Sequence, residues 1–383
     1  LNITTASSFT FTGTATMTIQ STVLVPSNIT WNGTGTITHT GIGITRDITW
    51  NPATGTPPLT FGAGTATYNL QSNITTRLVT SQVAHSGGTF NLNGFNVTCG
   101  IWSSSTTASR TLNFGANYIY LVTTTAGTTV VSIGDATSFN QTGTGGFSFA
   151  ASVTRTYSVG TTTLGTTLVL NPPNLFITSG ASVITIGGVS AIGYFRNADF
   201  SGYTGAFVAS QFVIYGDLTL GTTNPTSLTL TFRGNLSNTS FNPNGRTAGV
   251  AAVTFTMISN TFSLTGALIC TSLTLTTGII DFQSNTVTCT TTIGWTTATL
   301  ANIGTLQCTT FTQQIGNGVL FDFTVGTIIC TTAYTLTTGN FNLNGGTLTT
   351  VRFSLNGASS IVNLYSDLTF TSTTSIGFQF TAN

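Results

Sequence analysis

Five related segments follow one another in the last third of the chain: Gly266-Ala-Leu-Ile-Cys270, Asn285-Thr-Val-Thr-Cys289, Gly304-Thr-Leu-Gln-Cys308, Gly326-Thr-Ile-Ile-Cys330 and Gly346-Thr-Leu-Thr-Thr350. The cysteines recur about every 20 residues, which is close to one turn of a β-solenoid. In each segment an aliphatic residue stands two positions after the opening Gly or Asn, and Cys or Thr stands two positions later. Because side chains alternate between the faces of a β-strand, both should share one face, which we expect to point inward.

Two further repeats accompany this one. Leu273-Thr-Leu-Thr-Thr-Gly278 recurs as Tyr334-Thr-Leu-Thr-Thr-Gly339, and Gly88-Thr-Phe-Asn-Leu-Asn-Gly94 recurs far along the chain as Gly339-Asn-Phe-Asn-Leu-Asn-Gly345. A short unit that recurs cannot bury its apolar face alone, so copies must stack on one another. The sequence therefore predicts an all-β protein, a parallel β-solenoid (β-helix) with coils of about 20 residues.

Charged residues are scarce, and the predicted stacking explains why. Only 4% of the residues are charged, all of them Arg or Asp, so Lys and Glu are absent. In a solenoid, like side chains lie on like at about 4.8 Å, where Thr and Asn can hydrogen-bond and Lys or Glu would repel. The 27 Phe and 9 Tyr residues also argue against a disordered chain.

The pattern divides the chain into three sections. Residues 1–110 are predicted to form solenoid coils, residues 111–260 form a less regular β-rich section with longer loops, and residues 261–383 form regular coils with a Cys/Thr ladder. If the whole chain formed such coils, about nineteen of them would make a rod on the order of 90 Å long.

Composition also excludes some partners. The net charge is +1, and eight Arg residues scattered from Arg46 to Arg352 offer no basic patch for a phosphate backbone. Thr interrupts every apolar run, so we expect neither nucleic-acid binding nor a membrane span.

The cysteines are candidates for a disulfide or a metal site. We expect instead a structural ladder of Cys270, Cys289, Cys308, Cys330 and Thr350, because thiols one coil apart form a line and not a tetrahedron. The chain has five cysteines and no Cys-x-x-Cys motif. A bridge between stacked cysteines stays open as an alternative. We predict no metal and no cofactor.

Asp281 and Asp322 are the only catalytic candidates. Each precedes a repeat cysteine by eight residues, so the two would share one column about 9.5 Å apart. That separation lies near the upper limit for an inverting glycosidase. However, the expected intervening residue is Leu300, and no Glu, aromatic or basic residue recurs there to hold a sugar. We therefore interpret both as turn residues.

The histidines and tryptophans also have structural interpretations. His39 and His85 lie far apart, without Cys or Asp at ligand spacing, and are interpreted as surface or stacked side chains. Trp31 and Trp50 are separated by about one predicted coil length, which predicts a stacked aromatic column.

Short motifs carry a resemblance to known proteins. Gly88-Thr-Phe-Asn-Leu-Asn-Gly94 with the following Val97-Thr-Cys99, and Phe195-Arg-Asn-Ala-Asp-Phe-Ser-Gly202, resemble the Thr/Gly/Asn-rich repeat regions of marine bacteriophage structural (fibre-like) proteins. Secreted β-helical adhesins are similar in the general character of their sequences. The resemblance covers most of the chain and implies a virion fibre or a cell-surface appendage, and it brings no catalytic residue.

These observations predict a non-enzymatic structural subunit of an extracellular fibre. It would act as a rigid spacer or adhesin stalk of a virion (phage tail or head) fibre or a cell-surface appendage. The expected location is extracellular or the virion surface. The expected partners are copies of the chain or other fibre and virion proteins, with surface glycan as a further candidate. Two alternatives stay open: a self-assembling filament joined end to end by strand pairing, and a glycan-degrading, tailspike-like β-helix.

Overall fold

The computed structural model is all-β. It describes residues 9–62, 64–134, 138–159, 172–187, 192–222, 228–234, 239–246, 249–314, 320–356, 360–371 and 377–380. Every regular element in these ranges is a β-strand, and each strand pairs in parallel with the equivalent strand of a neighbouring coil. The parallel β-solenoid predicted from the repeats is therefore confirmed. The chain forms two compact units, residues 1–209 and 210–383, whose boundary falls inside the section predicted to be less regular.

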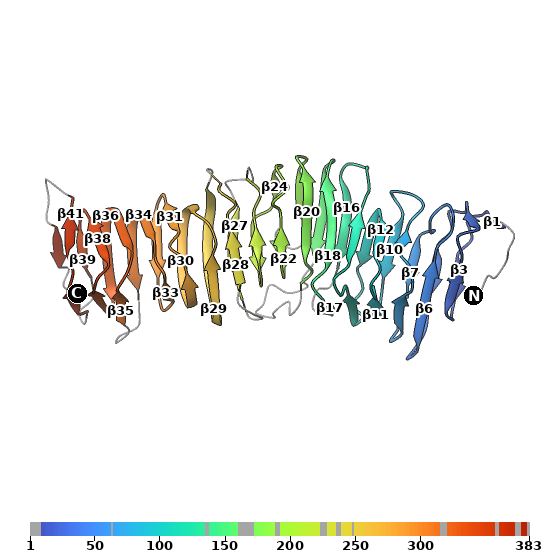
Figure 1. Cartoon of the computed structure of the whole chain (residues 1–383), viewed down its shortest axis with the longest axis horizontal. Helices are drawn as coiled ribbons and strands as arrows, with labels where there is room; N and C mark the ends of the chain where they lie inside the picture. The colour runs from blue at the N-terminus through green and yellow to red at the C-terminus, as the bar shows by residue number, and fades with distance from the viewer. Residues whose placement is uncertain are drawn as a thin grey trace. The chain divides into compact units, whose positions relative to one another are not determined.

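In the first unit, the coils contribute strands to three sheets, and successive coils lie side by side in chain order (Figure 1). The first sheet contains β2 (Met17–Ile19), β5 (Ile37–His39), β7 (Leu59–Phe61), β10 (Gln82–His85), β13 (Ile101–Ser104), β16 (Thr128–Ile133), β19 (Arg155–Val159), β21 (Ile184–Gly187) and β24 (Phe207–Val208). The second contains β3 (Val23–Val25), β6 (Thr45–Trp50), β8 (Thr67–Leu70), β11 (Gly88–Asn91), β14 (Arg110–Asn113) and β17 (Phe139–Thr142). The third contains β9 (Ile74–Thr75), β12 (Val97–Cys99), β15 (Tyr118–Leu121), β18 (Gly146–Ala151), β20 (Leu175–Gly180) and β23 (Ala198–Asp199). The remaining strands are β1 (Phe9–Phe11), β4 (Ile29–Trp31) and β22 (Ile192–Phe195).

In the second unit, several strands are long enough to run around a corner of the coil. Its strands are β25 (Gln211–Ile214), β26 (Leu218–Thr219), β27 (Thr229–Phe232), β28 (Thr239–Asn242), β29 (Val250–Leu264), β30 (Leu268–Asp281), β31 (Thr286–Cys289), β32 (Thr292–Trp295), β33 (Thr299–Ala301), β34 (Thr305–Gln314), β35 (Leu320–Phe323), β36 (Thr327–Thr338), β37 (Asn340–Leu343), β38 (Thr347–Thr350), β39 (Phe353–Leu355), β40 (Val362–Leu364), β41 (Leu368–Phe370) and β42 (Phe378–Phe380). The long strand β30 pairs in turn with β31, β32 and β33, so one strand spans three faces of the next coil.

The register shows the length of one coil. Asn91 pairs with Asn69 in the preceding coil, and the two asparagines are 22 residues apart. Asn91 also pairs with Asn113 in the following coil, at the same separation. The next step is longer: Thr111 pairs with Asn140, and the nearby Thr144 hydroxyl donates to the carbonyl of Gly115, 29 residues away. The coils of this part of the first unit are therefore longer than predicted, whereas the late coils match the prediction: Leu268 pairs with Val287, 19 residues away. The longest steps lie in the section for which longer loops were expected, where Arg155 pairs with Ile184.

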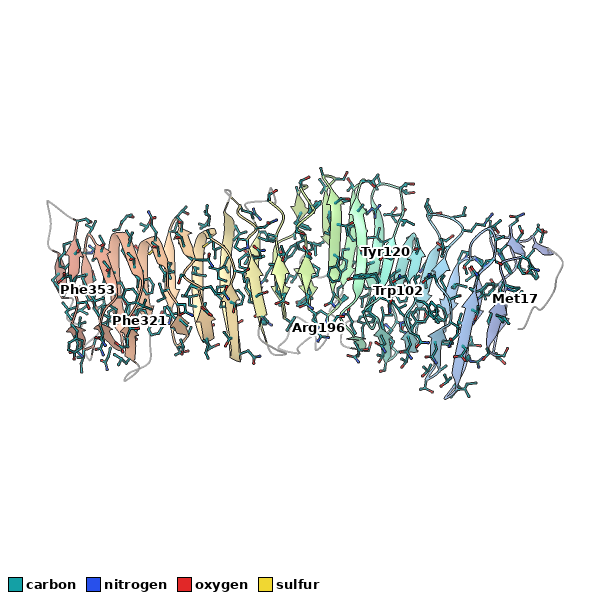
Figure 2. The ribbon with its side chains drawn as sticks, viewed as in Figure 1. Met17, Trp102, Tyr120, Arg196, Phe321 and Phe353 are labelled. Carbon is teal, nitrogen blue, oxygen red and sulfur yellow. The ribbon has the colours of Figure 1, made fainter. Side chains whose placement is uncertain are left out.

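The interior is built from the side chains that the repeats place on one face. Phe90 and Leu92 are 0% exposed, and so are Phe341 and Leu343 in the distant copy of the same motif. Side chains fill the space that the coils enclose, among them the fully buried Trp102 (Figure 2). Burial of each large apolar side chain contributes about 1.5–3 kcal/mol, so these stacked columns hold the coils together.

Candidate functional site

The predicted cysteine ladder lies inside the second unit. Cys270 is in register with Cys289, and Cys308 is in register with Cys330, which is in turn in register with Thr350. The Sγ atoms are 3.0 Å apart in the first pair and 3.9 Å apart in the second, and all four thiols are free and buried. A hydrogen bond with the neighbouring thiol and burial raise the pKa of Cys289 and Cys330 far above its usual range. These two thiols therefore stay protonated at neutral pH, which removes the thiolate that nucleophilic chemistry needs.

The prediction for Asp281 and Asp322 placed the wrong residue next to Asp281 in the adjacent coil. Asp281 is in register with Ala301 and not with Leu300. Eight residues separate Asp281 from Cys289, but only seven separate Ala301 from Cys308. The connection in the second coil is one residue shorter, so counting back from the cysteines gave the wrong residue.

The surroundings of the two aspartates differ. Asp281 Oδ1 accepts hydrogen bonds from the backbone N of Gln283 at 2.9 Å and from Nδ2 of Asn302 at 3.0 Å. Asp322 is exposed on β35, in register with Asn342. Asp281 therefore stabilises a turn and the adjacent coil, as the turn interpretation predicted.

Both histidines are buried inside the first unit, so the surface interpretation is wrong and the stacked one holds. Phe61 is in register with His39 on one side and with His85 on the other, and its ring lies 5.1 Å from that of His39. Trp50 Nε1 donates a hydrogen bond to His39 Nε2 at 3.3 Å. Burial lowers the pKa of each histidine to about 4, and the charge of Arg46 adds to this effect at His39.

Trp31 and Trp50 do not occupy equivalent positions. Trp31 pairs with Phe11, whereas Trp50 pairs with Val25 on a different sheet. The indole rings meet edge to face with centroids 6.0 Å apart. Asp47 pairs with Asn69 in the next coil, so one coil here is longer than the sequence separation of the two tryptophans. That separation is therefore not one coil length.

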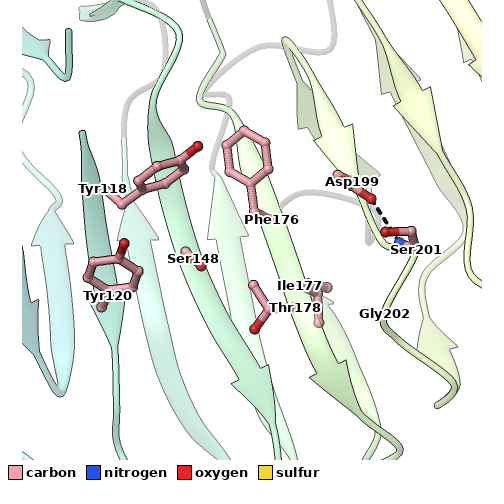
Figure 3. A pocket seen from close by; sticks show the side chains of 9 residues that line it. All are labelled: Tyr118, Tyr120, Ser148, Phe176, Ile177, Thr178, Asp199, Ser201 and Gly202. Atoms are coloured by element: carbon pink, nitrogen blue, oxygen red, sulfur yellow. Dashed lines mark hydrogen bonds between the residues drawn. The ribbon is translucent and has the colours of Figure 1, made fainter. Parts of the chain in front are cut away.

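A groove lies on the outer surface of the third sheet of the first unit and is here called the outer groove (Figure 3). It has a volume of about 360 Å³ and crosses β15, β18, β20 and β23. Its lining residues are Tyr118, Tyr120, Ser148, Phe176, Ile177, Thr178, Asp199, Ser201 and Gly202. This volume lies within the range of small-ligand pockets, about 300–1,000 Å³.

Three aromatic rings line the outer groove because strand alternation turns them outward. On β15, Ile119 and Leu121 are buried, so Tyr118 and Tyr120 point to the other face, and Tyr120 is 38% exposed. The Tyr118 ring lies 5.9 Å from that of Tyr120 and meets the Phe176 ring edge to face at 5.4 Å. The three rings therefore form a partly exposed apolar floor.

Polar groups surround this floor. Asp199 Oδ1 accepts a hydrogen bond from the backbone N of Ser201 at 2.9 Å, and Thr178 Oγ1 donates to the Phe149 carbonyl at 3.4 Å. A second cavity of about 320 Å³ adjoins the groove and is also lined by Tyr120 and Thr178, together with Arg155. The outer groove thus offers aromatic faces, hydroxyl groups and one carboxylate.

This groove was not predicted from the sequence. Tyr118-Ile-Tyr120 departs from the pattern of an outward Thr between inward residues, as in Val97-Thr-Cys99. An aromatic residue at a position that other coils give to Thr was the available signal.

No metal cluster was found in the described part of the chain, where no three His, Cys, Asp or Glu side chains are grouped as metal ligands. Those same residues contain no helix long and apolar enough to span a membrane. No protein-family model matches the chain, and neither a curated protein nor a solved structure matches it.

Proposed function

We propose that the protein is a non-enzymatic structural subunit of an extracellular fibre, serving as a rigid spacer or adhesin stalk. The observation that supports this function is the continuous stacking of like residues in parallel register. In the first unit, for example, Thr67, Thr89 and Thr111 form one such column. A chain hydrogen-bonded coil to coil in this way resists bending and needs no cofactor.

The location and partners follow from the same proposal. A spacer of this kind belongs on a virion, in a tail or head fibre, or on a cell-surface appendage. Its partners would be copies of itself or other fibre and virion proteins, with surface glycan as a ligand. The glycan-degrading alternative loses support because Asp281 already accepts one hydrogen bond within its turn and one from Asn302 in the next coil.

Electron microscopy of the purified chain tests the stalk function. We expect rod-shaped particles, because each coil adds about 4.8 Å along one axis. Compact globular particles would contradict the proposal. Light scattering at increasing protein concentration separates a stalk of fixed mass from a self-assembling filament, whose mass would grow.

A further inference from the structure

We propose that the outer groove binds a neutral oligosaccharide, whose sugar rings pack on Tyr118, Tyr120 and Phe176. The proposal gives the predicted glycan partner a site and a chemical class. It adds a ligand to the stalk function without depending on stiffness, so the two can fail separately.

The aromatic floor supplies the apolar half of this recognition. A pyranose ring presents C–H groups on its faces and hydroxyl groups around its edge, so it packs face-on against aromatic side chains. Tyr118, Tyr120 and Phe176 come from two coils and line one continuous cavity (Figure 3). Tyrosine rings also carry a hydroxyl group that can hydrogen-bond at the margin of the contact.

The polar lining supplies the other half. Asp199 uses Oδ1 for the Ser201 backbone, while Oδ2 has no hydrogen-bond partner among the described residues. A carboxylate oxygen in this position can accept hydrogen bonds from sugar hydroxyl groups. The hydroxyl groups of Tyr118, Tyr120 and Ser148 likewise make no hydrogen bond in the described part of the chain, and they line the same cavity.

A peptide strand is a poor fit for the outer groove. The central strand β18 pairs with β15 on one side and β20 on the other, and β20 pairs with β23. The backbone of the floor is therefore already engaged in the sheet, and strand addition has no free edge here. Recognition must come from side chains, which are aromatic and hydroxylated.

The charges of the site favour a neutral sugar over an acidic one. Among the described residues that line the outer groove itself, Asp199 is the only charged one. Arg155, beside the adjoining cavity, is buried and donates from its two terminal nitrogens to the carbonyls of Leu121 and Thr123 at 2.8 and 2.6 Å. This guanidinium holds the chain in place, so a sugar carboxylate would meet Asp199 without a compensating cation.

The dimensions favour an oligosaccharide over a single sugar. From β15 to β23 the groove crosses three coil steps, a distance of about 14 Å. The adjoining cavity extends it past Tyr120 toward Val122. Several linked rings can therefore contact the protein at once.

Calorimetric titration of the full chain with defined hexasaccharides tests this site. The probes are cello-, malto-, manno- and chito-hexaose as neutral ligands and an oligogalacturonate hexamer as the acidic one, each up to about 1 mM. At least one neutral probe should bind, and Tyr120→Ala or Phe176→Ala should each weaken that binding about five- to tenfold. Asp199→Asn, which keeps the side-chain size, should weaken it about tenfold.

Tyr365→Ala is the matched control, because Tyr365 is 68% exposed and lies in the second unit. It should leave the affinity unchanged, and all variants should keep the wild-type circular dichroism spectrum and melting temperature. The proposal is overturned if no neutral probe binds, if binding survives the combined Tyr120→Ala and Phe176→Ala changes, or if the acidic hexamer binds most tightly.

Discussion

The interior of the first unit differs from that of the late coils of the second unit, although Arg246 in the early coils of the second unit is also buried. The first unit buries both histidines and the guanidinium groups of Arg46, Arg110 and Arg155. In the late coils of the second unit, from Leu268 onward, the described interior holds aliphatic, aromatic and thiol side chains with a few neutral polar groups. In both units, equivalent strands of successive coils nevertheless pair in parallel, so the fold tolerates a polar interior.

Arg110 shows how the first unit accommodates a buried charge. Its Nε donates to Ser104 Oγ at 2.5 Å, and its terminal nitrogens donate to the carbonyls of Ser104 and Ala108 and to Ser138 Oγ. The chain here makes a long coil, in which Thr111 pairs with Asn140, and Arg110 donates to carbonyls and hydroxyls from both ends of that coil's turns. A buried cation that satisfies such carbonyls contributes to the fold, although an unsatisfied one would destabilise it.

The largest expected difference between the units is their response to acid. His39 and His85, the only histidines of the chain, are both buried in the first unit with pKa values lowered to about 4. The unfolded chain takes up these protons near pH 6.5 and the folded chain does not, so stability falls as the pH drops from 6.5 toward 4. Between pH 7 and pH 4.5 we expect a loss of about 2.5 kcal/mol for each histidine. Hydrogen exchange at both pH values should show the loss in the first unit.

His85→Phe is the variant that sharpens this expectation. Phe61 already occupies the neighbouring position in the same column, so Phe fits the slot. About half of the pH dependence should disappear, while stability at pH 7 should hold or rise, because within the described residues neither ring nitrogen of His85 makes a hydrogen bond of good geometry. An unchanged pH dependence would show that His85 is not the group being titrated.

A charge placed in the ladder of the second unit should have the next largest effect. Cys308 is 1% exposed and lies in a column without a buried charge. Cys308→Asp should cost about 4 kcal/mol at pH 7, measured by urea unfolding, because a buried carboxyl group must lose its charge. The control is Gln307→Asp, one residue away on the exposed face of β34, where we expect a change within about 0.5 kcal/mol. Equal effects at the two positions would contradict the assigned strand faces.

The sequence was sufficient to predict the fold class and the ladder. An aliphatic residue followed two positions later by Cys or Thr, as in Leu306 and Cys308, recurs in coil after coil. Strand alternation then places both side chains inside. Register across the turns could not be predicted in the same way. The step from Asp281 to Ala301 depends on a connection one residue shorter than its neighbour, and nothing in a period-2 pattern records turn length.

The outer groove was harder to predict for a related reason. Tyr120 and Phe176 belong to coils joined through long steps, from Ile119 to Phe147 and from Phe147 to Leu175. Repeat counting with the shorter period of the late coils does not bring these side chains together. Only the strand pairing shows that they share one surface.

A smaller difference should separate two buried tyrosines. In the second unit, Tyr334 donates a hydrogen bond to Gln313 Oε1 at 2.6 Å, whereas the buried Tyr157 hydroxyl in the first unit has no partner among the described residues. Tyr334→Phe leaves the buried Gln313 oxygen without this donor, so we expect a loss of about 1–3 kcal/mol in the free energy of unfolding. Tyr157→Phe should be neutral or stabilising. If both substitutions cost the same, the hydroxyl environments of the two units do not differ as described.

The smallest expected effect on stability concerns the stacked asparagine pairs that both units contain. Asn91 Nδ2 donates to Asn69 Oδ1 at 2.7 Å in the first unit, and Asn363 Nδ2 donates to Asn342 Oδ1 at 2.8 Å in the second. Asn91 and Asn342 occupy the same place in the two copies of the Phe-Asn-Leu-Asn-Gly motif.

Each of these half-exposed amide pairs should contribute about 0.5–1 kcal/mol. Asn91→Ala and Asn342→Ala should therefore lower the free energy of unfolding by similar small amounts, measured by urea titration. Asn→Ser at either site keeps a hydrogen-bonding group and should recover part of the loss. If Asn91→Ala destabilised the protein strongly while Asn342→Ala had no effect, the two copies would share a sequence without sharing an energetic role. The difference between the units would then extend from their interiors to their surfaces.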